Sequence, residues 1–250
     1  MGARRPHPLR IALLAVLLAT PAGGEELILT AAVSLREPLT EIVHRYQAEH
    51  PGIRVALGFG ASSFLAAQIR AGAPVDVFAS ADERIVAALR EEGLVQEGGS
   101  TVLARNRLVV LVASDADFPL EGPRDLAGPR VRRIAVPDGA VPVGRYAREW
   151  LARRGLLAAL EGRLVHTEHA RATLAAVDLG HADAAIVYAT DAPVARSARL
   201  AFPVPAEEQP RILYAVALLA GSRPGATGLF AYLRGAEARR LLEAAGFAAP

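Results

Sequence analysis

The chain of 250 residues contains no cysteine and no lysine. The absence of cysteine excludes disulfides, thiol nucleophiles, zinc–thiolate sites, iron–sulfur clusters and a lipid anchor on cysteine. The absence of lysine excludes Walker-type phosphate loops, Schiff-base chemistry and lysine general bases. An exported protein of this composition must fold without disulfides, and a chain of this length can bury a core large enough to do so.

The N-terminus has the three-part pattern of a secretory signal peptide. Arg4, Arg5 and Arg10 precede a short apolar run at residues 11–19, and the small residues of 20–22 offer a cleavage site. The apolar run is shorter than the roughly 20 residues that cross a bilayer, so a membrane anchor is the weaker interpretation. We therefore expect residues 1–22 to be a cleaved signal and the mature protein to be periplasmic.

Little net charge remains once the signal is removed. The whole chain has 28 basic and 26 acidic residues. The signal contains three arginines and no acid, which leaves 25 basic against 26 acidic residues, a net charge of −1. The mature chain has no basic stripe with interleaved aromatic residues, the pattern typical of proteins that bind nucleic acid. Nucleic acid is therefore not an expected partner.

Short apolar runs alternate with helical patterns along the mature chain. The expected strands are 27–32, 53–59, 75–79, 108–112, 133–136, 163–166, 184–188 and 212–220. The expected helices are 37–50, 63–71, 83–92, 145–154, 171–179 and a terminal region at 228–245. This alternation predicts an α/β fold with mostly parallel sheets. The length favours two lobes joined by two crossings, with lobe 1 at 25–104 and 208–250 and lobe 2 at 105–207.

Three expected strand-to-helix junctions are built from small, neutral residues that form hydrogen bonds. They are residues 30–35, 58–63 and 137–144, and the first two contain Ser34, Ser62 and Ser63. At such a junction the unpaired amides of a helix N-terminus favour an anion. A serine there is also a common N-cap, so each junction alone supports either interpretation. Together they predict a two-lobed binder of a small anion.

Other polar residues give weaker signals. His166 and His169 have a spacing that could serve a metal, but no third ligand is evident and a solvated loop pair is the favoured interpretation. Asp76, Asp82 and Asp191 lie next to turns, where capping is their expected role. No order of Ser, His and Asp supports a catalytic triad.

Five segments together resemble the periplasmic molybdate-binding proteins of ABC transporters. They occur in the order and with the spacing of that family across almost the whole mature chain. The segments are AAVSL (31–35), FGASSFLAAQI (59–69), AGAPVDVFASAD (71–82), VPDGAVPVGRYA (136–147) and AAIVYATDA (184–192). The resemblance implies a two-lobed fold with the ligand in the cleft between the lobes.

The resemblance also implies five ligand-binding positions. Ser34, Ser62 and Tyr188 would act through hydroxyl groups, and Val143 and Ala170 through backbone N–H groups. The residue types at 143 and 170 depart from those expected in the family, so the volume of the pocket could differ from that of the family. The neighbouring His169 could make the affinity depend on pH.

The expected function is capture of molybdate or tungstate for import by an ABC transporter, with a membrane permease as partner, no cofactor, no bound metal cation and no catalysis. The protein is expected to act as a monomer. One alternative is a binder of sulfate or another tetrahedral oxyanion. Another is an exported enzyme on the same scaffold, which would need an acid–base pair in the cleft. A ligand-sensing module of a regulator is disfavoured by the signal peptide.

Overall fold

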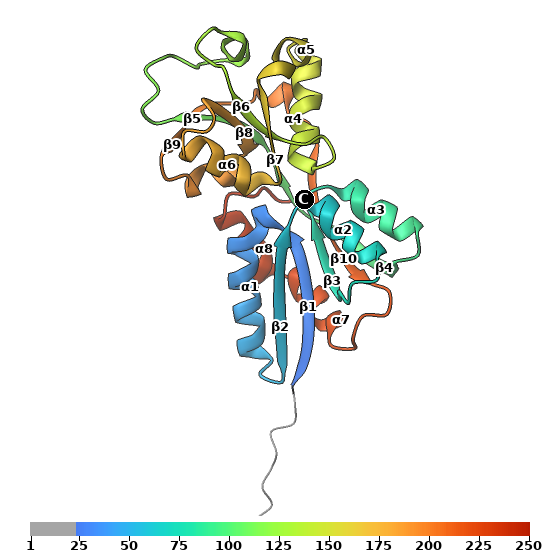
Figure 1. Cartoon of the computed structure of the whole chain (residues 1–250). Coiled ribbons are helices and arrows are strands. Elements are labelled where there is room, and N and C mark those ends of the chain that lie inside the picture. Colours follow the sequence, from blue (N-terminus) through green and yellow to red (C-terminus); the bar gives the residue numbers. More distant parts are fainter. Residues whose placement is uncertain (1–23) are drawn as a thin grey trace, which may run out of the picture.

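The computed structural model describes residues 24–250, and the expected signal peptide at 1–22 lies outside the described residues. The protein has two lobes, one above the other in Figure 1, and each contains one five-stranded sheet. The predicted two-lobed α/β fold is thus confirmed. Among the described helices, none is long and apolar enough to cross a membrane.

The lower lobe is built on the sheet β2-β1-β3-β10-β4. Its strands are β1 (Glu25–Ala32), β2 (Ile53–Gly60), β3 (Val77–Ser80), β4 (Val95–Asn106) and β10 (Ile212–Leu219). Helices α1 (Arg36–Glu49), α7 (Ala226–Leu233) and α8 (Ala236–Ala244) cover one face, and α2 (Ser62–Arg70) and α3 (Glu83–Glu91) cover the other (Figure 1). The helical spacing predicted for α1 is confirmed, because Leu39, Ile42, Val43 and Tyr46 are all buried.

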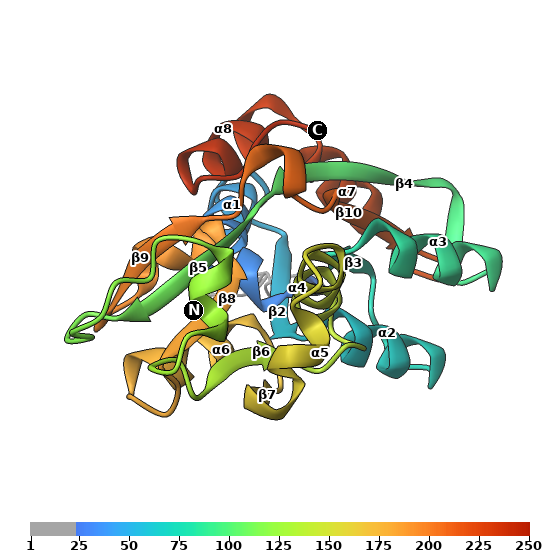
Figure 2. The same cartoon turned by 90° about the horizontal axis from the view of Figure 1, so that it is seen from above.

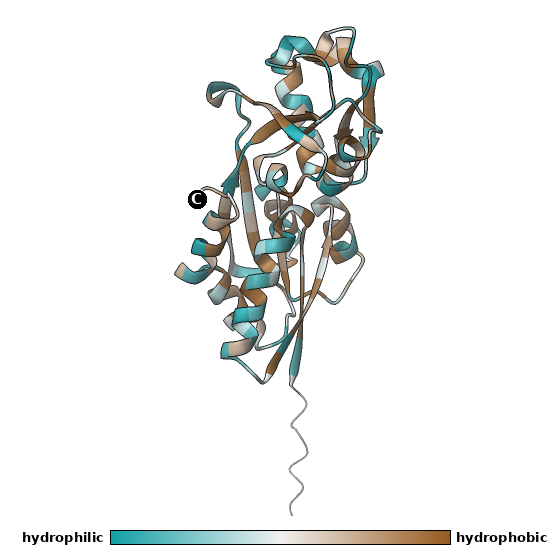
Figure 3. Cartoon of the chain, turned by 90° about the vertical axis from the view of Figure 1, so that its left-hand side faces the viewer, coloured by the Kyte–Doolittle hydropathy of each residue, from teal (hydrophilic) through white to brown (hydrophobic). Residues whose placement is uncertain are grey.

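The upper lobe is built on the sheet β7-β6-β8-β5-β9. Its strands are β5 (Leu108–Ala113), β6 (Ile134–Pro137), β7 (Leu164–Thr167), β8 (Ala184–Tyr188) and β9 (Ala198–Pro203). Helices α4 (Pro142–Arg153) and α5 (Leu157–Leu160) pack on one face, and α6 (Ala170–Asp178) packs on the other. Apolar residues concentrate in the strands of both lobes, as the brown colouring of Figure 3 shows, because helices cover both faces of each sheet.

Each sheet contains one reversed strand. In the lower lobe β1 pairs in parallel with β2 and β3, and β10 pairs antiparallel with β3 and β4. In the upper lobe β6 pairs in parallel with β7 and β8, and β5 pairs antiparallel with β8 and β9. Both reversed strands follow a crossing between the lobes, so they enter their sheets from the opposite end.

The two crossings lie side by side. The first is short, since β4 ends at Asn106 and β5 begins at Leu108, and Figure 2 shows β4 leading into β5. The second crossing follows β9. The side chain of Gln209 accepts a hydrogen bond from the Leu108 N–H at 2.8 Å and donates to the Leu108 carbonyl at 2.9 Å. This amide ties the second crossing to the first.

Three features differ from the sequence predictions. Strands β4 and β9 were not predicted, because Gly98, Gly99 and Ser100 interrupt the apolar run of β4 and Arg199 interrupts that of β9. Helix α4 begins at Pro142 instead of Arg145, because proline fits the first helical position. The terminal helical region is two helices, α7 and α8, which are separated at Arg234 and Gly235.

Candidate functional site

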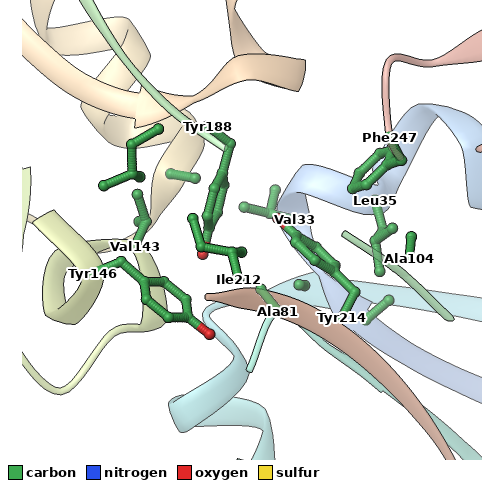
Figure 4. Close-up of a cluster of buried hydrophobic side chains, with 14 of the residues drawn as sticks. Val33, Leu35, Ala81, Ala104, Val143, Tyr146, Tyr188, Ile212, Tyr214 and Phe247 are labelled. Carbon is green, nitrogen blue, oxygen red and sulfur yellow. The ribbon is translucent and has the colours of Figure 1, made fainter. Parts of the chain in front are cut away.

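One pocket between the lobes brings together all five residues that the resemblance selected. Ser34 and Ser62 come from the lower lobe, and Val143, Ala170 and Tyr188 come from the upper lobe. The remaining lining residues are Ala32, Val33, Gly60, Ala61, Ala81, Val141, Pro142 and His169. In Figure 4, Tyr188 and Val143 lie opposite Val33 and Ala81 across this space.

The pocket is small and carries no formal charge on its lining. Its volume is about 10 Å³, close to the smallest cavity that holds a water molecule. A drug-sized ligand would need several hundred Å³. Among the described lining residues there is no Asp, Glu, Lys or Arg. The arrangement therefore fits a compact ligand, and it offers hydrogen-bond donors without a carboxylate acceptor.

Three helices begin at the pocket. Ser62 is the first residue of α2, Val143 the second residue of α4, and Ala170 the first residue of α6. The first N–H groups of a helix have no carbonyl partner within that helix, and the helix dipole favours negative charge there. Backbone donors from both lobes therefore converge on one small volume.

Helix α4 reaches the pocket because Gly144 allows a close approach. A Cβ atom at this position would overlap the carbonyl oxygens of Pro137 and Asp138 at the end of β6. Glycine lets the first turn of α4 lie against the strand end. This contact sets where the N–H of Val143 lies.

Ser62 is held with its hydroxyl proton free. Its Oγ accepts a hydrogen bond from the backbone N–H of Ala81 at 3.0 Å, and the side chain is 1 % exposed. An amide N–H is always the donor, so the hydroxyl hydrogen of Ser62 can point to a ligand. The alternative reading of Ser62 as an N-cap is not what the structure shows, since Ala61 occupies that position.

Ser34 lies in a short 3₁₀ helix, Val33–Leu35, between β1 and α1, and it does not cap a helix. Its Oγ lies 2.8 Å from the hydroxyl of Tyr214 on β10, and both side chains are buried. Tyr214 had no signal in the sequence, because its partner is 180 residues away. The only local pattern that could have suggested it is the buried strand in which it lies.

Tyr188 ends β8 with a buried hydroxyl that has no hydrogen-bond partner among the described residues. An unpaired buried hydroxyl costs roughly 1–3 kcal/mol, so its presence calls for a partner. Burial raises the pKa of Tyr188 well above its ordinary value, so the group keeps its proton and remains a donor. The hydroxyl is thus available to a ligand in the pocket.

Two ion pairs join the lobes on either side of the pocket. Arg145 of α4 donates to Asp82, which precedes α3, with Nη2 2.8 Å from Oδ2. Arg171 of α6 contacts Glu37 of α1 at 2.5 Å. Each arginine closely follows a predicted ligand-binding position in its helix. Helices α4 and α6 therefore each supply one pocket amide and one ion pair between the lobes.

Asp82 and Asp191 are buried carboxylates outside the pocket lining. The predicted capping role of Asp82 is confirmed, because its side chain accepts from the N–H of Arg84 at 3.0 Å. Burial raises the pKa of Asp82 above its ordinary value, although Arg145 opposes the shift. Asp191 lies 3.1 Å from the Nε of Arg171, and burial raises the pKa of Asp191 to about 6.

The two histidines have different surroundings. His169 lines the pocket and is the N-cap of α6, where its Nδ1 accepts from the N–H of Ala172 at 3.0 Å. His166 lies in β7 outside the pocket lining. Within residues 24–250, no cluster of three metal-ligating side chains is present.

A wider groove opens next to the pocket and is lined from both lobes. It has a volume of about 660 Å³ and is bordered by Phe64 of α2 and by Glu168 and His169 of the upper lobe. Phe64 is 62 % exposed and lies at the rim of this groove. The groove is thus a surface depression where the two lobes meet.

Comparison with known proteins agrees with this architecture. Residues 27–248 match the model of a family described as bacterial extracellular solute-binding protein. The molybdate-binding protein ModA of Mycobacterium tuberculosis is 32 % identical over 231 residues, which cover 91 % of this chain and 86 % of that protein. This chain belongs to the bacterial extracellular solute-binding proteins.

Two solved structures show the same fold. The periplasmic molybdate-binding protein of Azotobacter vinelandii has a TM-score of 0.79 and 24 % identity, with 90 % of this chain and 99 % of that chain covered. The sulfate-binding protein SubI of M. tuberculosis has a TM-score of 0.77 and 17 % identity, with 89 % and 86 % covered. The fold is therefore shared by proteins named for different tetrahedral anions, and the ligand must be argued from the pocket.

Proposed function

We propose that this protein binds molybdate, with tungstate as a near equivalent, and delivers it to the permease of an ABC transporter. The relatives named for molybdate binding support this proposal over most of the chain length. The observation that carries it is the composition of the pocket, in which donors from both lobes converge without any carboxylate.

The donor set matches a fully deprotonated dianion. Molybdate and tungstate carry no proton at neutral pH, so they need donors only. The hydroxyls of Ser34, Ser62 and Tyr188 and the amides of Val143 and Ala170 would supply them. A hydrogen bond to a charged group contributes roughly 1.5–3 kcal/mol net, so several exceed the roughly 8 kcal/mol of micromolar binding.

Protonated oxyanions fit the same pocket less well. Phosphate keeps a proton at neutral pH and needs an acceptor, and the described lining offers no carboxylate.

Sulfate has the charge and shape of molybdate but shorter bonds, so discrimination must come from how closely the lobes fit the ion. Val143 and Ala170 contribute side chains to that fit.

The experiment is a calorimetric titration of the mature protein with molybdate, tungstate, sulfate and phosphate. Molybdate and tungstate should bind at least about 100-fold more tightly than sulfate, a difference of roughly 2.8 kcal/mol. Equal binding of sulfate would overturn the proposed molybdate specificity in favour of the sulfate alternative.

Molybdate binding should also survive treatment with EDTA, because the ion is held by hydrogen bonds. Loss of binding with EDTA and its recovery with zinc would make His166 and His169 metal ligands.

Transport without catalysis is the role that the pocket supports. The titratable side chains on its described lining are His169 and Tyr188, and the imidazole Nδ1 is occupied by the helix cap. An exported enzyme would need an acid–base pair in the cleft. We propose that the mature protein is a periplasmic monomer with lobe 1 at 25–104 and 208–250 and lobe 2 at 105–207, and that the closed form docks on the permease.

A further inference from the structure

The bond between Ser34 and Tyr214 has two possible directions. Either hydroxyl could donate across the 2.8 Å that separates their oxygens. The direction matters for an anion in the pocket. If Ser34 donated to Tyr214, its oxygen would present a lone pair to the ligand; if Ser34 accepts, its hydrogen is free to be donated to the ligand.

Asn106 at the end of β4 favours one direction. The backbone N–H of Arg107 donates to its Oδ1 at 2.8 Å, which fixes the orientation of the amide group. Its NH₂ group therefore faces Thr190 Oγ1 at 2.9 Å and the Tyr214 hydroxyl oxygen at 3.4 Å. An amide NH₂ can only donate, so Tyr214 accepts from Asn106 and keeps its single hydrogen for a neighbouring oxygen, of which Ser34 Oγ lies 2.8 Å away.

We propose that Tyr214, oriented by Asn106, is a positioning residue that makes Ser34 a donor to the bound oxyanion. The inference rests on the proposed function. Tyr214 plays toward Ser34 the part that the Ala81 N–H plays toward Ser62, where the direction is fixed by the backbone. Both serines then present a hydrogen to the pocket, as a fully deprotonated dianion requires, because such an ion only accepts hydrogen bonds.

The packing of Tyr214 holds this arrangement in place. Its side chain is fully buried, and its ring makes edge contacts with Tyr188 at 5.6 Å and with Phe247 at 5.1 Å between centroids. In Figure 4, Val143 and Tyr214 lie on opposite sides of Val33. Tyr214 is not part of the pocket lining, so its hydroxyl can influence a ligand only through lining residues, and its 2.8 Å contact is with Ser34.

A double-mutant cycle with molybdate as the probe tests the inference. Tyr214→Phe should lower the affinity about 5- to 30-fold, as expected for losing the orientation of one charge-assisted hydrogen bond. In a Ser34→Ala background the same substitution should change the affinity less than about 2-fold, because its effect passes through the Ser34 hydroxyl. A purely structural role would give the same loss in both backgrounds.

Tyr232→Phe is the matched control, because it removes a partly exposed hydroxyl that contacts Glu49 far from the pocket. Asn106→Leu is a second variant in case Tyr214→Phe does not fold. It keeps Tyr214 but removes the hydrogen bond that orients the Tyr214 hydroxyl. It should lower the molybdate affinity less than Tyr214→Phe does, and this loss should also disappear in the Ser34→Ala background. Wild-type protein that binds no molybdate would contradict the proposed function itself. Wild-type binding with unchanged affinity in Tyr214→Phe, or equal losses in both backgrounds, would overturn this inference alone.

Discussion

Tyr188 and Ser62 line the same pocket, but their hydroxyl groups differ in whether they form a hydrogen bond within the protein. The Tyr188 hydroxyl has no partner among the described residues, whereas the Ser62 oxygen serves the Ala81 amide. Loss of the Tyr188 hydroxyl should therefore lower only the ligand affinity. Loss of the Ser62 hydroxyl should lower both the ligand affinity and the stability of the fold. This difference separates a binding role from a structural one at single residues.

Tyr188→Phe should weaken molybdate binding about 10- to 150-fold and leave the ligand-free protein at least as stable as the wild type. The affinity falls because one donor to the ion is lost, roughly 1.5–3 kcal/mol. The stability does not fall because the hydroxyl is unpaired without ligand. Calorimetric titration and thermal unfolding without molybdate check both parts. A lower melting temperature with unchanged affinity would make Tyr188 a core residue.

Ser62→Ala should weaken both properties. The ligand loses a donor, and the buried N–H of Ala81 loses its acceptor, which costs roughly 1–3 kcal/mol of stability. Denaturant unfolding of the ligand-free variant gives the second value independently of binding. Ser63→Ala is the matched control, since Ser63 follows in the same helix turn and does not line the pocket. Equal effects of the two substitutions would remove the special role of Ser62.

At the scale of elements, the ion pair between Arg145 of α4 and Asp82 before α3 joins the two lobes, and we expect it to hold them closed on the ligand. Arg145→Ala should speed molybdate release about 5- to 30-fold, because Asp82, only 4 % exposed, would lose its partner from the other lobe and keep only Arg84, which lies in its own lobe. Stopped-flow displacement measures the release rate. Arg148→Ala on the same helix breaks a pair with Glu161 inside the upper lobe and should leave the rate unchanged. Similar rates in both variants would show that closure does not depend on this ion pair.

The whole molecule should show a pH dependence that originates at Asp191. Its pKa of about 6 in the folded protein is above the ordinary 3.8, because burial disfavours the charged form. Below about pH 4 both folded and unfolded states hold the proton, and between pH 4 and 6 only the folded state does. The contribution of Asp191 to the free energy of unfolding should therefore fall as the pH rises through this window and stay level above it.

The measurement compares wild type with Asp191→Asn by denaturant unfolding between pH 3.5 and 7.5. The stability of wild type relative to the variant should drop by about 1–3 kcal/mol from pH 4 to 6. Asn retains an oxygen for the N–H of Tyr188, which Asp191 binds at 3.3 Å. A constant difference across the range would contradict the raised pKa.

The sequence predicts the parts of this molecule that depend on local pattern. Uninterrupted apolar runs identified β5, β8 and β10, and residues implied by the resemblance lie together in one pocket, although their roles stay predictions. Strand β4 was missed because Gly98, Gly99 and Ser100 interrupt its apolar pattern, and its pairing with β10 contains register shifts. The support behind Ser34 also could not be predicted, because Tyr214 and Asn106 reach it only through tertiary contacts.

The absence of cysteine has a practical consequence at the groove beside the pocket. A Phe64→Cys substitution would introduce the single thiol of the chain at an exposed position, so one fluorophore would attach at one place. The lower-lobe position of Phe64 faces Glu168 and His169 of the upper lobe across the groove. A dye there would change its surroundings whenever the lobes move, and its emission would make the protein an optical sensor for its own ligand.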